Sequence, residues 1–209
     1  CACLVGSEMC IRDRVNLIPR FYDASAGQVC FLGQDVRKYR RKELRDQIGI
    51  VPQKAVLFAG TVRENMQWGK KDATDEEIWE ALKTAQAEEF IRAKEGGLDA
   101  NIEQGGRNLS GGQRQRLTIA RALVKKPRVL ILDDSASALD YATDAALRKA
   151  IRQMEGAPTV FIVSQRTSSL MSADRILVLD DGEATGYGTH EELLKNCSVY
   201  KEILSLIHI

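Results

Sequence analysis

The stretch Asn108–Asp140 constrains the fold of this chain more than any other part of the sequence. It begins with an amphipathic segment, is interrupted at Pro127, and then reaches the four consecutive apolar residues Val129–Leu132. A short apolar run of this kind is typical of a strand buried on both faces of a parallel sheet. Asp133 and Asp134 follow at once, so the sequence predicts two carboxylates at the carboxyl edge of the sheet, where α/β proteins bind ligands.

The other end of this stretch predicts an anion-binding helix start. Ser110 can cap the helix that follows it, because its hydroxyl can accept a hydrogen bond from a backbone N–H of the first turn. Gly111 and Gly112 carry no side chains, which lets an anion approach the exposed N–H groups. A phosphate-binding helix start and a metal-binding strand end, so close in sequence, indicate nucleotide chemistry.

Length and composition fit one globular domain with a sizeable core, since 44% of the 209 residues are hydrophobic and 28% are charged. The net charge of +1 provides no broad positive field, so we interpret the basic residues after Ser110 as solvated and expect no nucleic-acid partner. No run of about 18 apolar residues is present, so no segment is expected to span a membrane. No pair among the five cysteines has other metal-ligand residues nearby in the sequence, which favours a reducing, cytosolic setting.

Strands that alternate with helices indicate a doubly wound α/β core. Residues 27–33 are typical of the beginning of an antiparallel hairpin, and short strands are expected at 48–52, 159–163 and 175–179. Residues 72–94 are expected to form a helical segment in which Thr74 and Glu77 make a capping box. Thr189 and Glu192 predict a second capping box at a C-terminal helix.

Three motifs together resemble the nucleotide-binding domain of ATP-binding-cassette (ABC) proteins: LSGGQRQR at 109–116, VLILDD at 129–134 and SALD at 137–140. A chance glycine-rich loop before a core strand would not carry all three in the family's order and spacing. The resemblance implies an α/β fold with a P-loop NTPase-like core, an antiparallel β edge and an inserted α-helical subdomain at about 72–124. It also implies that ATP and Mg²⁺ are bound and that ATP is hydrolysed.

The segment VLFAGTVREN at 56–65 resembles the exporter branch of this family. That branch implies a transmembrane domain on the same native polypeptide, with this domain at the cytoplasmic face of the cell membrane. Residues 102–107 match the segment that touches the membrane-domain coupling helices in exporters, although a glycine-containing linker would look the same. A soluble importer subunit is disfavoured by the exporter-like segment. A chromosome-maintenance or repair ATPase of the same family is disfavoured because no long coiled coil precedes the signature.

The phosphate loop GxxxxGK[ST], which the family carries near its N-terminus, is missing. The corresponding region reads CACLVGSEMCIRDRVNLIPRFYD, and no other part of the chain contains the motif. We expect residues 1–14 to be truncated or non-native, residues 15–203 to form one ABC nucleotide-binding domain without its phosphate loop, and residues 204–209 to be a non-native tail. The chain by itself is therefore expected to be inactive, and a fragment without function is an alternative interpretation.

The resemblance implies a role for each polar residue of the motifs. Asp133 is expected to hold Mg²⁺, directly or through water, and Gln53 to contact both Mg²⁺ and the attacking water. Asp134 stands where active members carry the Glu that polarises this water, and Gln165 where they carry a His at the γ-phosphate. The nucleotide is expected to contact Ser110, Gly111, Gly112, Gln113 and Asp140.

Two of these residues depart from the family pattern in ways that weaken ATP hydrolysis. Asp134 is one methylene shorter than Glu, which withdraws its carboxylate by about 1.5 Å, and a misplacement near 1 Å can cost on the order of 10²-fold in rate. Gln165 is neutral and cannot relay a proton. We therefore expect the degenerate half of a heterodimeric exporter. Its signature would act in trans, on the ATP of a second, non-identical nucleotide-binding domain.

Overall fold

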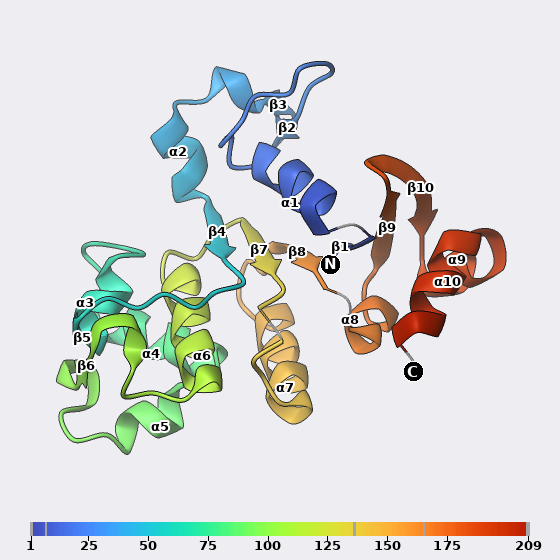
Figure 1. Ribbon diagram of the computed structural model, residues 1–209. Helices are drawn as coiled ribbons and strands as arrows, with labels where there is room; N and C mark the ends of the chain where they lie inside the picture. Colours follow the sequence, from blue (N-terminus) through green and yellow to red (C-terminus); the bar gives the residue numbers. More distant parts are fainter. Residues whose placement is uncertain (1, 7, 136, 165, 208–209) are drawn as a thin grey trace. The chain divides into compact units, whose positions relative to one another are not determined.

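The computed structural model describes residues 2–6, 8–135, 137–164 and 166–207, and the chain forms two compact units (Figure 1). The first unit contains residues 1–48, 131–134 and 159–209, and the second contains residues 49–130 and 135–158. Strand β7 (Val129–Asp133) passes from the second unit into the first. Within the described ranges, no helix has both the length and the apolar character needed to cross a membrane.

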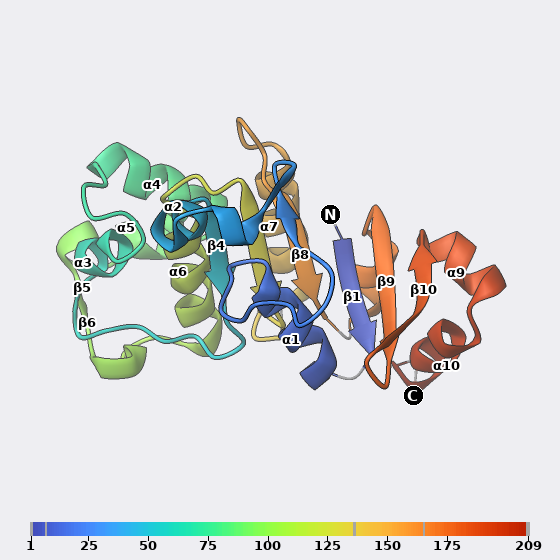
Figure 2. The same cartoon turned by 90° about the horizontal axis from the view of Figure 1, so that it is seen from above.

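The first unit is built on a sheet in which the strand order is β10-β9-β1-β8-β7 (Figure 2). The bounds of its other strands are Ala2–Gly6 (β1), Thr159–Val163 (β8), Arg175–Asp180 (β9) and Glu183–Gly188 (β10). Strand β1 runs parallel to both β8 and β9, whereas β10 is antiparallel to β9 and carries a register shift between Ala184 and Gly186. The predicted parallel core with an antiparallel edge is confirmed.

The N-terminal segment forms regular structure. Ala2 lies opposite Phe161 of β8 and opposite Arg175 of β9, so β1 is hydrogen-bonded on both sides. Helix α1 (Glu8–Leu17) follows directly and packs against β1 and β8. The segment at 1–14, expected from the sequence to be truncated or non-native, therefore supplies a strand in the interior of the sheet and most of a helix.

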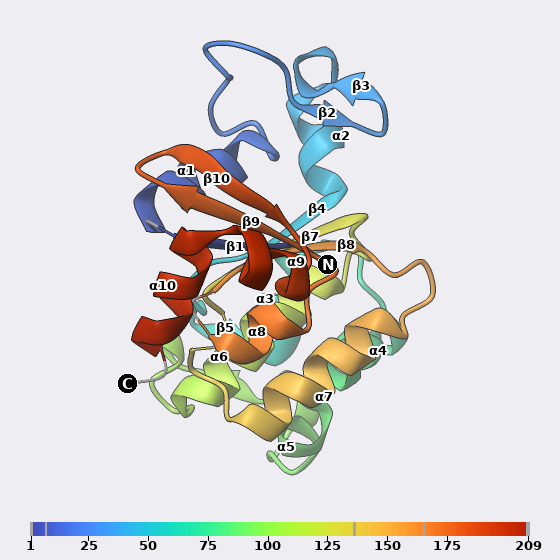
Figure 3. The same ribbon diagram turned by 90° about the vertical axis from the view of Figure 1, so that its right-hand side faces the viewer.

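The remaining elements of the first unit surround this sheet. Helix α9 (His190–Asn196) contacts β10, and helix α10 (Ser198–Ile207) contacts β9 (Figure 3). Residues 30–35, which follow α1 in the chain, form a small hairpin whose two-residue turn, Leu32 and Gly33, has positive φ at both positions, as a type I′ turn requires. The other bounds are Cys30–Phe31 (β2), Gln34–Asp35 (β3), Val36–Lys38 (η1), Arg41–Asp46 (α2) and Thr167–Met171 (α8).

The second unit is largely helical, with α4 packed against α6 and α7. Its bounds are Ile48–Val51 (β4), Gly60–Thr61 (β5), Val62–Gln67 (α3), Asp75–Thr84 (α4), Glu88–Arg92 (α5), Gly97–Asp99 (η2), Asn101–Ile102 (β6), Gln104–Gly106 (η3), Gly111–Leu123 (α6) and Tyr141–Arg152 (α7). Its core is apolar, because Ile78, Leu82, Ile91, Leu117 and Ile119 are fully buried.

The helical segment expected at 72–94 is divided into α4 and α5. Gln86 between them has a φ of 57°, and a left-handed residue cannot continue a right-handed helix. The capping box at the start of α4 is confirmed, because Thr74 Oγ1 accepts from the N–H of Glu77 and Glu77 Oε2 accepts from the N–H of Thr74. The second predicted capping box, at Thr189 and Glu192, is confirmed in the same way at α9.

A glycine allows close contact between the end of α3 and helix α6. A Cβ at Gly69 would overlap the carbonyl oxygen of Arg121 and lie 2.8 Å from Cγ1 of Val124. We expect Gly69→Ala to lower the free energy of unfolding by about 1–3 kcal/mol, because backbone must move to admit the methyl group. Urea unfolding measures this loss. At Gly111 the nearest atom to an added Cβ is 3.9 Å away, so an equal loss in Gly111→Ala would contradict the steric explanation.

Candidate nucleotide site

The start of α6 carries the first part of the predicted site. Ser110 Oγ accepts from the N–H of Gln113 at 3.2 Å, and Gln113 Oε1 accepts from the N–H of Ser110 at 3.0 Å. The predicted helix cap is confirmed, as a complete capping box. Because Oγ acts as the acceptor here, the Ser110 hydroxyl proton can still be donated to an anion. The N–H groups of Gly111 and Gly112 have no partner within the helix, since no carbonyl precedes them in it.

The SALD loop lies against this helix start. A Cβ at Gly112 would lie 3.2 Å from the carbonyl oxygen of Ala138, a tight contact that places the loop close to the helix start. Two residues later, Asp140 caps α7: its Oδ1 accepts from the N–H of Thr143 at 2.9 Å, and its Oδ2 accepts from the Thr143 hydroxyl at 2.6 Å. The structure thus brings the signature residues and the SALD loop together within the second unit.

This part of the site is open to solvent. Ser110, Gly111 and Asp140 are all exposed, and the ring of Tyr141 beside them is 72% exposed. Ser110 and Gly111 are exposed and Gly112 is half-buried, so an anion can approach this helix start from outside the unit.

The two carboxylates stand at the end of β7, as the sequence predicted. Asp133 is the last residue of the strand and Asp134 follows it with a φ of 44°, in the left-handed region that Asp adopts more readily than most residues. The N–H of Asp134 donates to the carbonyl of Val163 at 2.9 Å. This bond fixes the turn that leaves the sheet, so the position of the Asp134 backbone is set by β8.

Asp133 does not fit the magnesium role that the sequence implies for it. Both of its carboxylate oxygens accept from Nε of Arg12, at 3.2 and 3.1 Å. Mg²⁺ needs near-octahedral oxygen ligands at about 2.0–2.1 Å. Among the described residues, no group of three or more His, Cys, Asp or Glu side chains could hold a metal ion. As the chain is folded, the guanidinium of Arg12 lies against both carboxylate oxygens of Asp133.

The other predicted residues are distributed over the chain. Gln53 is an exposed residue in the loop after β4 and belongs to the second unit, whereas Asp133 and Asp134 belong to the first. Gln165 lies outside the described residues. The structure therefore brings together Asp133 and Asp134 in one unit, and Ser110, Gly111, Gly112, Gln113 and Asp140 in the other.

An aromatic patch near Gln53 was not predicted from the sequence. We define it as Val56, Phe58, Trp68 and Arg121, all in the second unit. The rings of Phe58 and Trp68 contact each other at a tilt of 30°, with centroids 4.7 Å apart, yet Trp68 is 68% exposed. Arg121 supports the patch by donating from Nη2 to the carbonyl of Val56 at 2.9 Å. The sequence signal that could have indicated this patch was the presence of three large apolar residues, Val56, Phe58 and Trp68, in or beside the loop that follows Gln53.

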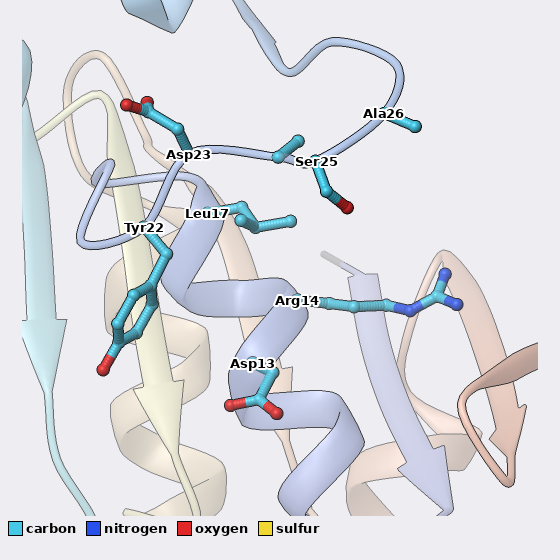
Figure 4. A pocket seen from close by; sticks show the side chains of 8 residues that line it. Asp13, Arg14, Leu17, Tyr22, Asp23, Ser25 and Ala26 are labelled. Atoms are coloured by element: carbon cyan, nitrogen blue, oxygen red, sulfur yellow. The ribbon is translucent and has the colours of Figure 1, made fainter.

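A pocket of about 460 Å³ lies elsewhere in the first unit, between the C-terminal half of α1 and the loop that follows it (Figure 4). Asp13, Arg14, Leu17, Tyr22 and Ser25 are among its lining residues. None of the residues predicted to bind nucleotide or metal lines this pocket, so it is not part of the candidate site.

Comparison with known proteins agrees with the motifs. A sequence model described as ABC transporter matches residues 15–137. An uncharacterised ABC transporter ATP-binding protein of Mycobacterium tuberculosis is 46% identical over 191 residues, which are 90% of this chain and 32% of that protein. A Bacillus subtilis protein, whose name describes multidrug export and an ATP-binding/permease protein, is 43% identical over 192 residues, 92% of this chain and 33% of that protein.

A solved structure gives the same answer for the fold. The structure of a bacterial Atm1-family ABC exporter with ATP bound matches with a TM-score of 0.90 and 35% identity, covering 98% of this chain and 36% of that chain. The predicted P-loop NTPase-like α/β fold is thereby confirmed. The chain spans about a third of the length of the curated relatives it matches.

The cap of α7 predicts a pH dependence. Hydrogen bonds from the hydroxyl and the N–H of Thr143 lower the pKa of Asp140 below its usual value. The folded-state pKa is depressed, so the stabilisation is complete above the unfolded-state pKa of about 3.9 and is lost as the pH falls through the lower, folded-state value. Asn caps helices comparably but does not titrate. The stability of the native chain relative to Asp140→Asn, from urea unfolding, should therefore fall between pH 5 and strongly acidic pH; a constant difference would contradict this.

Proposed function

Because this chain belongs to the ABC transporter family, we propose that it is the ATP-binding and ATP-hydrolysing domain of an exporter-type transporter. The observation that carries the proposal is the start of α6, where Ser110 caps the helix, two glycine N–H groups stay open, and the SALD loop lies alongside. The relatives named as export proteins support the exporter class. Their names also include a permease, which supports a transmembrane domain on the same native polypeptide, with this domain at the cytoplasmic face of the membrane.

The proposed action of the signature is electrostatic. The transferred phosphoryl group carries charge on its oxygens, and hydrogen-bond donors fixed in advance stabilise that charge as it develops. Ser110 would donate its hydroxyl proton, and Gly111 and Gly112 would donate their N–H groups at the positive end of the α6 dipole. Gln113 keeps Ser110 in place through the capping box, and Asp140 fixes the loop beside it.

We further propose that these donors act on the neighbour's ATP, in a dimer with a second, non-identical nucleotide-binding domain. The exposure of Ser110 and Gly111 supports this arrangement, because these residues are reachable from outside the unit. The chain's own half-site would be degenerate, since Asp134 and Gln165 replace the longer carboxylate and the imidazole of active members. In the native protein, ATP and Mg²⁺ would be the ligands of this pair of sites.

The absence of a phosphate loop is proposed to be a property of this chain and not of the native protein. We propose that residues 1–14 replace native sequence and that residues 204–209 are foreign, with 15–203 as the native domain. The absence of GxxxxGK[ST] from residues 1–14 supports this proposal, and the family match also begins at residue 15, whereas the structural match covers 98% of the chain. An intact GK[ST] loop joined to VNLIPRFYD at the native locus would agree, whereas SEMCIRDR in the native gene would refute it.

The aromatic patch is the proposed contact with the transmembrane domain. A contiguous exposed apolar patch marks an interaction surface more often than scattered apolar residues do, and Val56, Phe58 and Trp68 are 48%, 38% and 68% exposed. The patch follows Gln53, whose proposed role is to sense the membrane domain. A partner that covers Trp68 would therefore be placed to act on the Gln53 loop. We also propose that residues 102–107 take part in this contact with the transmembrane domain.

The trans arrangement predicts unequal effects of two substitutions on ATP hydrolysis by the full-length protein co-purified with its partner. Ser110→Arg should lower the rate by on the order of 10²-fold or more, because it removes a donor and fills the anion position. Asp134→Asn should reduce it only modestly. Thr189→Ala, which removes an equivalent capping hydroxyl at α9, is the control and should have little effect. Equal losses from Ser110→Arg and Asp134→Asn would contradict the trans assignment.

The docking proposal predicts that Trp68→Ala weakens attachment to the transmembrane domain. A buried aromatic anchor at an interface is often worth about 2 kcal/mol or more, so limited proteolysis should release the domain from the full-length transporter about 30 times faster. Tyr187→Ala is a matched control, because Tyr187 is 69% exposed and lies on β10, away from the patch residues in sequence. Equal release from both variants would show that the patch is not the contact.

A further inference from the structure

We infer that Arg12 is a built-in counter-ion for Asp133, which keeps this carboxylate from taking up Mg²⁺ in the chain as it stands. The inference goes beyond ATP hydrolysis and export, because it concerns which cation Asp133 binds. It begins from the fit described above: both oxygens of the carboxylate predicted to hold a metal share the single Nε–H of Arg12.

The fold holds Arg12 in this position. Ile11 and Val15 lie one helical turn apart on α1 and are 1% and 5% exposed, so that face of the helix is fixed by burial. Helix α1 contacts β1 and β8, and β8 is the neighbour of β7, whose last residue is Asp133. Arg12 directly follows the buried Ile11 and contacts Asp133 through Nε. Its backbone is therefore anchored on the same sheet that carries Asp133.

The C-terminal part of α1 has a second anchor. Arg14 donates from Nη2 to the carbonyl of Gly182, in the turn between β9 and β10. Helix α1 is thus held by burial in its middle and by a hydrogen bond at Arg14. Both ties lie within the first unit, so a rigid shift of the helix that would free Asp133 must break other contacts as well.

Partial burial makes the contact between Arg12 and Asp133 more durable than a surface ion pair. The side chains of Arg12 and Asp133 are 32% and 21% exposed. Charged groups screened less by water attract more strongly, and a guanidinium remains charged at all ordinary pH values. A magnesium ion could reach Asp133 only by displacing this fixed cation and by giving up part of its tightly held water shell.

A consequence follows for the first unit. A carboxylate that normally needs a metal for charge compensation is compensated by the chain itself, so the folded state gains nothing from Mg²⁺ at this position. Arg12 acts as a positioning residue for Asp133 and touches no substrate. Because Arg12 lies in the segment 1–14, a native domain with its phosphate loop would lack this counter-ion.

The test is thermal unfolding of the 209-residue chain with EDTA or with millimolar Mg²⁺. The unsubstituted 209-residue chain should show the same unfolding midpoint in EDTA and in Mg²⁺. Arg12→Gln should unfold at a lower temperature in EDTA, and Mg²⁺ should raise its midpoint by on the order of 2 °C, since the metal then binds the folded state only. Arg12→Lys retains the charge and should remain insensitive to Mg²⁺. Arg148→Gln breaks another close Arg–Asp pair, with Asp144 on α7, and should be destabilised without any response to Mg²⁺.

Mn²⁺ used as a paramagnetic probe locates the effect. In Arg12→Gln, Mn²⁺ should broaden the amide resonances of Asp133 and Asp134. In the unsubstituted 209-residue chain it should not. The inference is overturned if Mn²⁺ broadens these resonances in the native chain, or if Arg12→Gln responds to neither ion. Should Arg12→Gln fail to fold, the native chain and Arg12→Lys still decide: site-specific broadening in either one would refute the counter-ion role.

Discussion

Burial of the apolar run Val129–Leu132 is the constraint on which both ends of the candidate site depend. All four side chains are less than a tenth exposed, and full burial of such a side chain is worth about 1.5–3 kcal/mol. The chain enters this run from helix α6 and leaves it at Asp133. The run cannot shift without exposing apolar surface. Its burial therefore fixes the places in the fold of the segments joined to it, the Ser-Gly-Gly helix on one side and the acidic pair on the other.

The local features of the site could be predicted from the sequence, because each depends on neighbouring residues. Ser110 and Gln113 are three residues apart, and so are the pairs that cap α4 and α9; the capping boxes follow directly from that spacing. The strand at 159–163 was predicted with its observed bounds. The break at Gln86 was not predicted, because the apolar pattern continues across it and only the left-handed backbone shows the interruption.

Contacts between distant parts of the chain were beyond sequence reasoning. Arg12 and Asp133 are 121 positions apart, and no pattern in a single sequence links them. The stack of Phe58 on Trp68 is closer in sequence, but it needs the chain to reverse at α3 before the rings meet. Which residues act on nucleotide stays a prediction from the motifs, whereas the contact between Arg12 and Asp133 became visible only in the fold.

The two ends of the stretch 108–140 therefore differ in how complete a nucleotide site each provides in this chain. The start of α6 is complete and exposed, whereas the acidic end lacks a phosphate loop and has Asp133 engaged by Arg12. Calorimetric titration of the 209-residue chain with Mg-ATP tests most directly whether the stretch makes a nucleotide site of its own. Because the phosphate-holding loop is absent, we expect no saturable heat in the micromolar range. Micromolar binding would show that the chain forms a self-contained nucleotide site.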